Sequence, residues 1–376
     1  MKIRKVTAAD LKLGMLIPWN VYGENGVLLV RKGHMITSAN QIAYLIERGS
    51  FEDHDGDQES HQPPSALRKL NAAYVELPIL LQAVARRAAP GLRRKLEDIA
   101  LLVHDAVGLS VDVATAAVMH NQHQAKYAAR HSVNTAVVAT IMAKARQRSR
   151  DEVMAITLAA LTMNVGMQEH HQRWQDSDAA LDATDRARML AHPELGVELL
   201  RAAGIQDEAW LSCVLHHHEN EDGTGYPLGK VGAQIPLPSK LLALADRYCA
   251  RVSERAYRPT MTPNAALRDM LLETRATLDN NLASLMIREL GIYPIGTYVR
   301  MINGEVGVVS RRGLQSTTPH VESVIGPRGA PLEVFLQRDT RNPLHAIREV
   351  LSNAQLAALA APPLRMEQVW GRAAAV

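Results

Sequence analysis

The chain of 376 residues has two cysteines and two phenylalanines, and aromatic residues make up only 4% of it. Cys213 and Cys249 cannot form a disulfide framework, and both lie in apolar sequence of helical periodicity, so we expect buried thiols and a cytoplasmic protein. Runs of about 18 apolar residues are absent, and the amino-terminal stretch lacks the apolar segment of a signal peptide. We therefore expect neither a membrane span nor a signal sequence.

A large excess of one charge is also missing. The 42 basic and 39 acidic residues leave a formal charge of +3, too small for the basic stripe that binds a nucleic-acid polymer. What the chain has in excess is histidine, since nine of its 15 histidines lie within residues 120–218. This clustering indicates imidazole chemistry in the middle of the chain.

The pattern of apolar residues divides the chain into segments. Short apolar runs predict a small α/β module over residues 1–50, and a polar linker with a helical connector follows over 51–118. Helical periodicity dominates 119–290, and an Asn-Gly turn between two β-type runs predicts a small β module over 291–342. Residues 343–376 are expected to form a helical or flexible tail. The predicted fold class is mainly α, with β-rich modules on both sides.

The most specific motif begins with two adjacent histidines at the end of an amphipathic segment. His217 and His218 are followed by Glu219 and, after two further residues, by Asp222-Gly223-Thr224-Gly225-Tyr226-Pro227. Neighbouring helical side chains point about 100° apart, so both imidazoles reach one site only near the end of the helix. The glycines and the proline then require a tight loop outside the helix.

This stretch resembles the HHExxDGxGYP motif of the HD-GYP family, bacterial members of the HD superfamily that hydrolyse cyclic di-GMP at a metal centre. The resemblance covers about residues 119–290 and implies a helical bundle of the HD type. The flanking modules also resemble those often joined to such domains. The residues that the resemblance implies are metal ligands at His131, His192, His217, His218 and Asp246, phosphate-binding arginines at Arg255 and Arg258, and a partner-binding loop with Asp222, Gly223, Gly225, Tyr226 and Pro227.

The chain departs from the family pattern where the His-Asp pair should stand. Met163 and Asn164 occupy that place, and Met167 replaces the lysine that follows it. A thioether and a neutral amide cannot supply the imidazole and the bridging charge that two closely spaced divalent ions require. One divalent metal, Fe, Mn or Zn, could still bind to His192, His217 and His218, and His131 with Asp246 would be a depleted second site. Whether any metal binds is left open.

Neighbouring residues do not restore the pair in this interpretation. His170 and His171 follow in what we expect to be a solvated loop, and Tyr127 stands where members with a third metal carry a carboxylate. His192 with Pro193 is expected to open a helix.

The candidates also have purely structural interpretations. The paired histidines could be satisfied by backbone groups, Asp246 could be a buried partner of an arginine, and the arginine pair could solvate a helix end. Surface or packing roles are expected for His120, His123 and His216.

Two main hypotheses follow for the function. The first is a catalytically degenerate HD-GYP protein of cyclic di-GMP signalling, which binds the nucleotide or a partner such as a GGDEF domain and hydrolyses weakly or not at all. The second is an active metal-dependent phosphodiesterase that yields pGpG or GMP. A third, an HD-type output domain with no nucleotide role, is disfavoured by the GYP loop and the arginine pair. The sequence leaves open whether the chain forms a homodimer.

Overall fold

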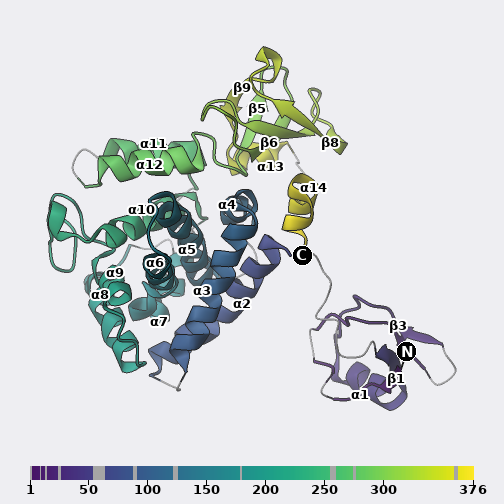
Figure 1. Cartoon of the computed structure of the whole chain (residues 1–376). Coiled ribbons are helices and arrows are strands. Elements are labelled where there is room, and N and C mark those ends of the chain that lie inside the picture. Colours follow the sequence, from purple (N-terminus) through teal and green to yellow (C-terminus); the bar gives the residue numbers. More distant parts are fainter. Residues whose placement is uncertain are drawn as a thin grey trace. The chain divides into compact units, whose positions relative to one another are not determined.

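The computed structural model describes residues 2–8, 10–12, 15–23, 27–53, 64–87, 91–121, 126–177, 180–254, 260–273, 277–359 and 363–376. The chain divides into two compact units, Met1–Pro63 and Pro64–Val376 (Figure 1). Arg255, Arg258 and His123 lie outside the described residues, so their predicted roles stay predictions.

The first unit is a small antiparallel sheet with one helix. Its strands lie in the order β1-β4-β2-β3 and comprise β1 (Lys2–Lys5), β2 (Val21–Tyr22), β3 (Leu28–Val30) and β4 (Ser50–Asp53). Helix α1 (Ala39–Arg48) begins after Ser38, whose side chain accepts a hydrogen bond from the amide of Gln41. Val21, Leu45 and Phe51 are among the residues of a separate hydrophobic core, so this unit buries its own apolar side chains.

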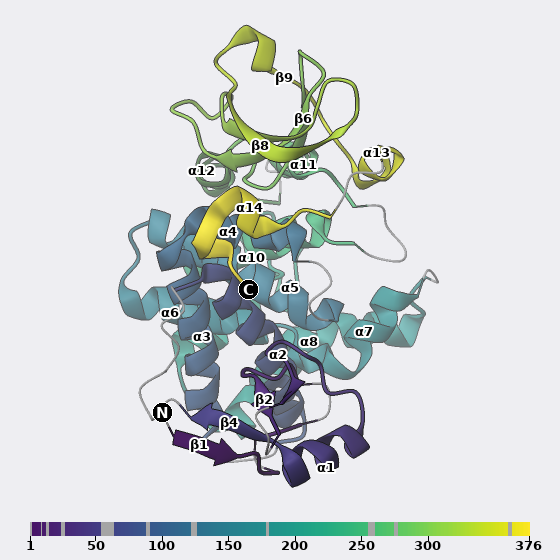
Figure 2. The ribbon, with the colours of Figure 1, turned by 90° about the vertical axis from the view of Figure 1, so that its right-hand side faces the viewer.

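The second unit is built on a helical bundle, which confirms the mainly α fold (Figure 2). Helix α5 (Tyr127–Ala145) is its centre: apart from Arg130, residues 127–143 are buried, as expected of a helix covered on all sides. It packs against α6 (Arg150–Thr162) and α10 (Leu237–Val252). The other helices of the bundle are α2 (Ala66–Ala85), α3 (Leu92–Leu109), α4 (Val111–His120), α7 (Gln168–Asp176), α8 (Ala183–Ala202), α9 (Glu208–His216), α11 (Pro263–Glu273) and α12 (Asn280–Leu290).

Within the described ranges, no single helix is long and apolar enough to cross a membrane. The bent pair of α3 and α4 passes that test by length and composition alone, and both helices contribute buried side chains to the main core.

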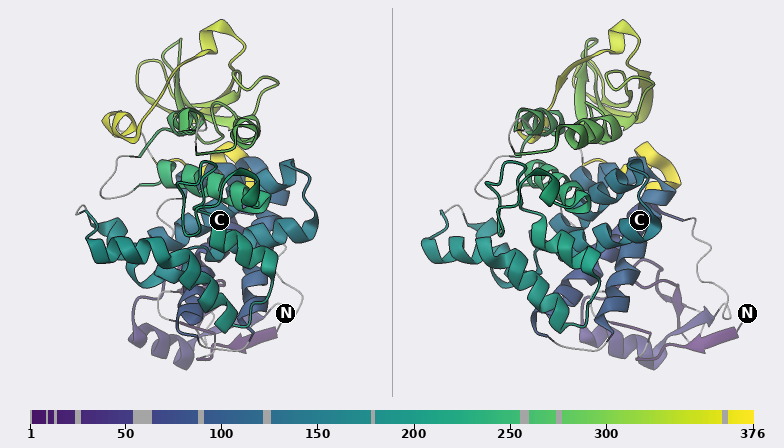
Figure 3. Two further views of the ribbon diagram at one scale, coloured as in Figure 1. Left: turned by 90° about the vertical axis from the view of Figure 1, so that its left-hand side faces the viewer. Right: turned by 60° about the vertical axis from the view of Figure 1, so that its left-hand side comes forward.

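A five-stranded antiparallel sheet follows the bundle (Figure 3). Its strand order is β8-β7-β6-β5-β9, with β5 (Tyr298–Met301), β6 (Val306–Arg311), β7 (His320–Ile325), β8 (Pro331–Asp339) and β9 (Ile347–Val350). The predicted Asn-Gly turn joins β5 and β6, and Gly304 adopts a φ of 88°, a conformation that favours glycine.

The end of the chain differs in part from the expected helical or flexible tail. Residues 347–350 form β9, which pairs with β5, whereas α13 (Asn353–Ala358) and α14 (Met366–Trp370) are short helices. A run of four residues is too short for periodicity to distinguish a strand from a helix. Its strand conformation is supported by Ile347 and Val350, which pack against the main core.

Candidate metal centre

The structure brings together three of the predicted metal ligands. His192 lies within α8, His217 follows the last residue of α9, and His218 is next to it. One nitrogen from each imidazole lies within 4.8 Å of the others, and Nε2 of His192 is 3.3 Å from Nε2 of His217. His192 and His217 are buried, and His218 is half-buried. Among the residues that the structure describes, this is the one group of three or more His, Cys, Asp or Glu side chains close enough to share an ion.

A proline fixes the orientation of His192. Our expectation that His192 and Pro193 open a helix is wrong, because α8 begins at Ala183, after Asp182 accepts a hydrogen bond from the amide of Asp185. Pro193 therefore lies inside the helix and has no N–H to donate to the carbonyl of Met189, four residues earlier. Nδ1 of His192 lies 2.5 Å from that carbonyl and donates to it instead.

His217 is fixed in a similar way at the end of α9. Its Nδ1 donates to the carbonyl of Val214 at 2.7 Å, one of the last carbonyls of the helix, which have no partner inside it. With both Nδ1 atoms donating, a neutral ring carries its lone pair on Nε2. Each of the two rings therefore points an acceptor nitrogen toward the other.

The burial of the triad keeps these rings neutral. Burial, followed by the neighbouring His217, lowers the pKa of His192 to about 3, and burial also lowers the pKa of His217 and of His218. Two neutral nitrogen lone pairs that face each other cannot share a hydrogen bond, but a cation between them would be stabilised. Two nitrogens bound tetrahedrally to one zinc ion at about 2.0–2.1 Å are separated by about 3.3 Å. The residues therefore fit one divalent metal, which when bound would supply Lewis acidity and an activated water.

The GYP loop covers one side of the triad. The ring of Tyr226 stacks on His218, with 4.6 Å between the ring centroids and 24° between the planes. Buried Glu219 holds the loop through both carboxylate oxygens, which accept hydrogen bonds from the amides of Leu228 at 2.8 Å and Lys230 at 2.9 Å. The motif alone does not indicate this role of Glu219.

Two further residues of the motif shape the same loop. The carboxylate of Asp222 accepts hydrogen bonds from the amide and the hydroxyl of Thr224 at 3.0 and 2.6 Å. A Cβ atom on Gly225 would lie 2.3 Å from the amide nitrogen of Asn220, so only glycine fits there. The loop is therefore braced internally.

The other two predicted ligands bond to each other. Nε2 of His131 lies 2.7 Å from Oδ1 of Asp246, and both residues are buried. Burial acts to raise the pKa of Asp246, but the hydrogen bond and the charge of His131 hold it well below the usual range. Within the described residues, Nδ1 of His131 has no hydrogen-bond partner. The pair thus satisfies its two closest atoms without an ion.

The residues in place of the His-Asp pair lie in the core. Met163 is the C-cap residue after α6, and Asn164 precedes one turn of 3-10 helix, η1 (Val165–Met167). The exposed fractions of Met163, Asn164 and Met167 are 0%, 4% and 9%. A Cβ atom on Gly166 would lie 2.2 Å from the carbonyl oxygen of His192, so this turn packs directly on α8 beside the triad.

The two histidines after this turn do not form a solvated loop. They lie in α7, and His171 is only 4% exposed. Its ring lies edge-on to His131, with 6.2 Å between centroids, and to Tyr127, at 5.5 Å. Tyr127 stacks on His131 at 5.4 Å. Our expectation was wrong because the polar sequence of α7 has too few apolar residues to show helical periodicity, although one of its histidines faces the core.

The histidines assigned to packing have that role where they are described. Nε2 of His120 donates to the carbonyl of Gly296 at 2.7 Å, and Nδ1 of His216 donates to the carbonyl of Ser212 at 2.8 Å. Neither belongs to the triad.

Comparisons with known proteins match the segment of the chain that carries the triad. The family model described as HD domain matches residues 113–282. A cyclic di-GMP phosphodiesterase of Pseudomonas aeruginosa is 31% identical over 206 residues, which cover 54% of this chain and 49% of that protein. Residues 113–282 thus match the HD domain family, and the motif that begins at His217 resembles that of the HD-GYP proteins.

Other proteins are similar to this chain over different lengths. A cyclic di-GMP phosphodiesterase response regulator of Xanthomonas campestris is 32% identical over 154 residues, 40% of each protein. A solved structure of an HDG"Y"P protein from Bdellovibrio bacteriovorus matches with a TM-score of 0.49 and 15% identity, over 76% of this chain and 98% of that one. The chain spans about half the length or less of the curated relatives named here.

Proposed function

We propose that this chain is a cyclic di-GMP signalling protein with a degenerate HD-GYP domain, which acts by binding the nucleotide or a GGDEF-type partner and hydrolyses weakly or not at all. The observation that carries this proposal is the asymmetry of the centre. The triad converges on one point, whereas Met163 and Asn164 stand where the family has its His-Asp pair.

The charge available for a two-ion mechanism is too small. Two divalent ions need an anionic bridge, and the neutral amide of Asn164 offers none. The one carboxylate among the implied ligands, Asp246, is bonded to His131 at 2.7 Å. With a single ion, stabilisation of the nucleophile and of the leaving group falls by on the order of several kcal/mol. Hydrolysis is therefore impaired, but one Fe, Mn or Zn ion still suits the triad.

The braced GYP loop supports a binding role. Glu219 and Asp222 hold its backbone through hydrogen bonds within the loop, so its surface is formed before any partner arrives. Tyr226 joins this surface to the triad through its stacking on His218. Phosphate contacts from Arg255 and Arg258 belong to the same proposal.

An active metal-dependent phosphodiesterase is the second candidate. It is favoured by the intact triad and by the cyclic di-GMP phosphodiesterase activity for which the curated relatives are named.

Metal analysis combined with nucleotide assays distinguishes the two candidates. Purified protein is analysed for Fe, Mn and Zn, and is then given cyclic di-GMP with added Mn²⁺ or Fe²⁺ while binding and release of pGpG and GMP are followed. We expect up to one metal per chain and binding without appreciable turnover. Turnover that is abolished in His217→Ala but kept in the matched control His216→Gln would overturn the proposal in favour of an enzyme.

A restoring variant tests how far the site has changed. Met163→His, Asn164→Asp and Met167→Lys are introduced together. Turnover in this variant would show that the rest of the centre is competent and that these three positions account for the loss. If turnover stays absent, other residues around the ligands must have changed as well.

A further inference from the structure

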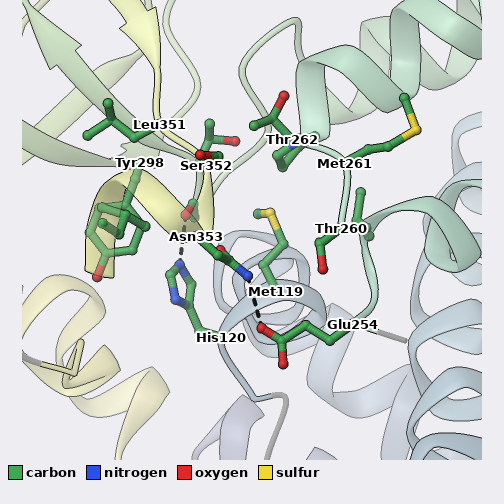
Figure 4. A pocket seen from close by; sticks show the side chains of 15 residues that line it. Met119, His120, Glu254, Thr260, Met261, Thr262, Tyr298, Leu351, Ser352 and Asn353 are labelled. Carbon is green, nitrogen blue, oxygen red and sulfur yellow. Dashed lines mark hydrogen bonds between the residues drawn. The ribbon is translucent and has the colours of Figure 1, made fainter. Parts of the chain in front are cut away.

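A cavity lined by none of the triad residues lies between the bundle and the carboxy-terminal sheet (Figure 4). Its volume is about 110 Å³. Its walls come from the end of α4, the segments that leave α10 and enter α11, the start of β5, and the start of α13. Nothing in the proposed function uses this cavity.

Glu254 is the one acidic residue among the described residues that line the cavity. Asn353, from α13, donates a hydrogen bond to its Oε1 at 2.9 Å, and this bond is visible in Figure 4. The described part of the chain gives the other carboxylate oxygen no hydrogen bond, so it remains available to a ligand. Arg130 interacts electrostatically with Glu254 but does not line the cavity.

Thr297 supplies an independent sign of a ligand. It lines the cavity and is 2% exposed, and its hydroxyl has no hydrogen-bond partner within the residues described. A buried hydroxyl without a partner loses its hydrogen bonds to water and gains none in return. A polar group bound in the cavity would remove this cost.

The other polar side chains among the described residues that line the cavity bring no positive charge. His120 donates from Nε2 to the carbonyl of Gly296 at 2.7 Å, and burial lowers its pKa, so the ring is neutral and its Nδ1 can only accept. Helices α4 and α10 end at the cavity while α11 and α13 begin there, so their dipoles oppose one another. Within the described part of the wall, the negative charge of Glu254 is therefore the one formal charge.

The other part of the wall is apolar. Met119, Val252, Leu351 and Leu356 line it, and they suit a short alkyl group. Since a cavity of about 150 Å³ admits benzene, the volume found here accommodates a chain of about five heavy atoms. The combination of one carboxylate, an unpaired hydroxyl and an apolar wall suits a small amphipathic cation.

We propose that this cavity binds a small primary alkylamine, with its ammonium group at Glu254 and its alkyl chain against the methionine and leucine side chains. The recognition needs one charge, one buried hydroxyl and a few methylene contacts. It is independent of the metal centre and of the proposed signalling function.

Calorimetric titration of the whole chain with n-butylamine, n-butanol and sodium butyrate tests the proposal. We expect binding of the amine and little or none of the neutral and anionic compounds. Glu254 is exposed, so solvent screens its charge, and Glu254→Gln should weaken amine binding about two- to fivefold. The exposed Glu333→Gln is the matched control and should bind normally.

Thr297→Val provides a second variant of similar shape. We expect amine affinity to fall several-fold while the melting temperature is unchanged or rises, because the substitution removes a buried hydroxyl without a described partner. Equal binding of n-butanol and n-butylamine, unchanged affinity in Glu254→Gln, or no binding of the amine would each overturn the proposal.

Discussion

The triad of His192, His217 and His218 and the pair of His131 and Asp246 lie in the same bundle, but their buried nitrogens are satisfied differently. In the triad, backbone carbonyls take the Nδ1 protons of His192 and His217 and leave their Nε2 lone pairs facing each other at 3.3 Å. In the pair, a carboxylate and an imidazole bond directly at 2.7 Å. The triad geometry is thus completed by a cation, whereas the two closest atoms of the pair already satisfy each other. The two groups of predicted ligands therefore differ in which atoms stay available to an ion.

Acid should expose this difference most strongly in metal-free protein. The pKa of His192 is lowered from 6.5 to about 3 by burial and by His217, and that of His217 is lowered by burial. Between the folded and unfolded pKa values the unfolded chain binds more protons, so the free energy of unfolding falls as the pH drops below 6.5. We expect a loss of about 1.4 kcal/mol per pH unit for each histidine that stays neutral.

Urea unfolding of chelator-treated protein between pH 7 and about 5 measures this slope. The variant His192→Gln removes one titrating group and should make the slope shallower by about 1.4 kcal/mol per pH unit. A stability that does not change over this range would contradict the neutral, buried triad.

Removal of one histidine of the triad should abolish most of its metal binding. We expect His217→Ala to lower metal affinity by more than about 100-fold, because even residues that only orient a ligand contribute 10–100-fold. Competition with a chromophoric chelator measures the affinity. His216→Gln, one position earlier and outside the triad, is the control that should bind metal normally. If both variants retain metal, the ion binds elsewhere.

The sequence predicted the elements that carry the two groups of ligands, but not the contacts that distinguish the groups. Periodicity predicted the bundle, the Asn-Gly turn predicted the β5–β6 hairpin, and the motif brought His217 and His218 to one helix end. The bond between His131 and Asp246 joins residues 115 positions apart, and no local pattern reports it. The buried position of His171 was missed because its helix is mostly polar. Local patterns thus predicted elements and ligand types, and long-range packing decided which ligand atoms stay available.

Substitution of Asp246 in the pair with His131 should lower the stability of the fold and leave metal binding unchanged. Asp246→Asn removes the negative charge from a buried hydrogen bond, for which we expect a loss of about 2 kcal/mol. Metal content per chain should stay at the wild-type value, because the triad does not include Asp246. Thermal unfolding and elemental analysis of the same sample measure both effects. Loss of metal together with stability would mean that Asp246 is a ligand after all.

Pro193→Ala should have the opposite effect to Asp246→Asn. We expect a gain of stability and a loss of metal affinity. The new amide N–H can donate to the carbonyl of Met189 within α8, so the helix is stabilised and the amide competes with Nδ1 of His192 for that oxygen. Without that bond the imidazole can rotate or change tautomer, and we expect metal affinity to fall about tenfold. Chelator competition and thermal unfolding measure the two effects, with exposed Glu194→Gln as the control. Unchanged affinity would show that packing alone orients His192, because the backbone bond would then be dispensable.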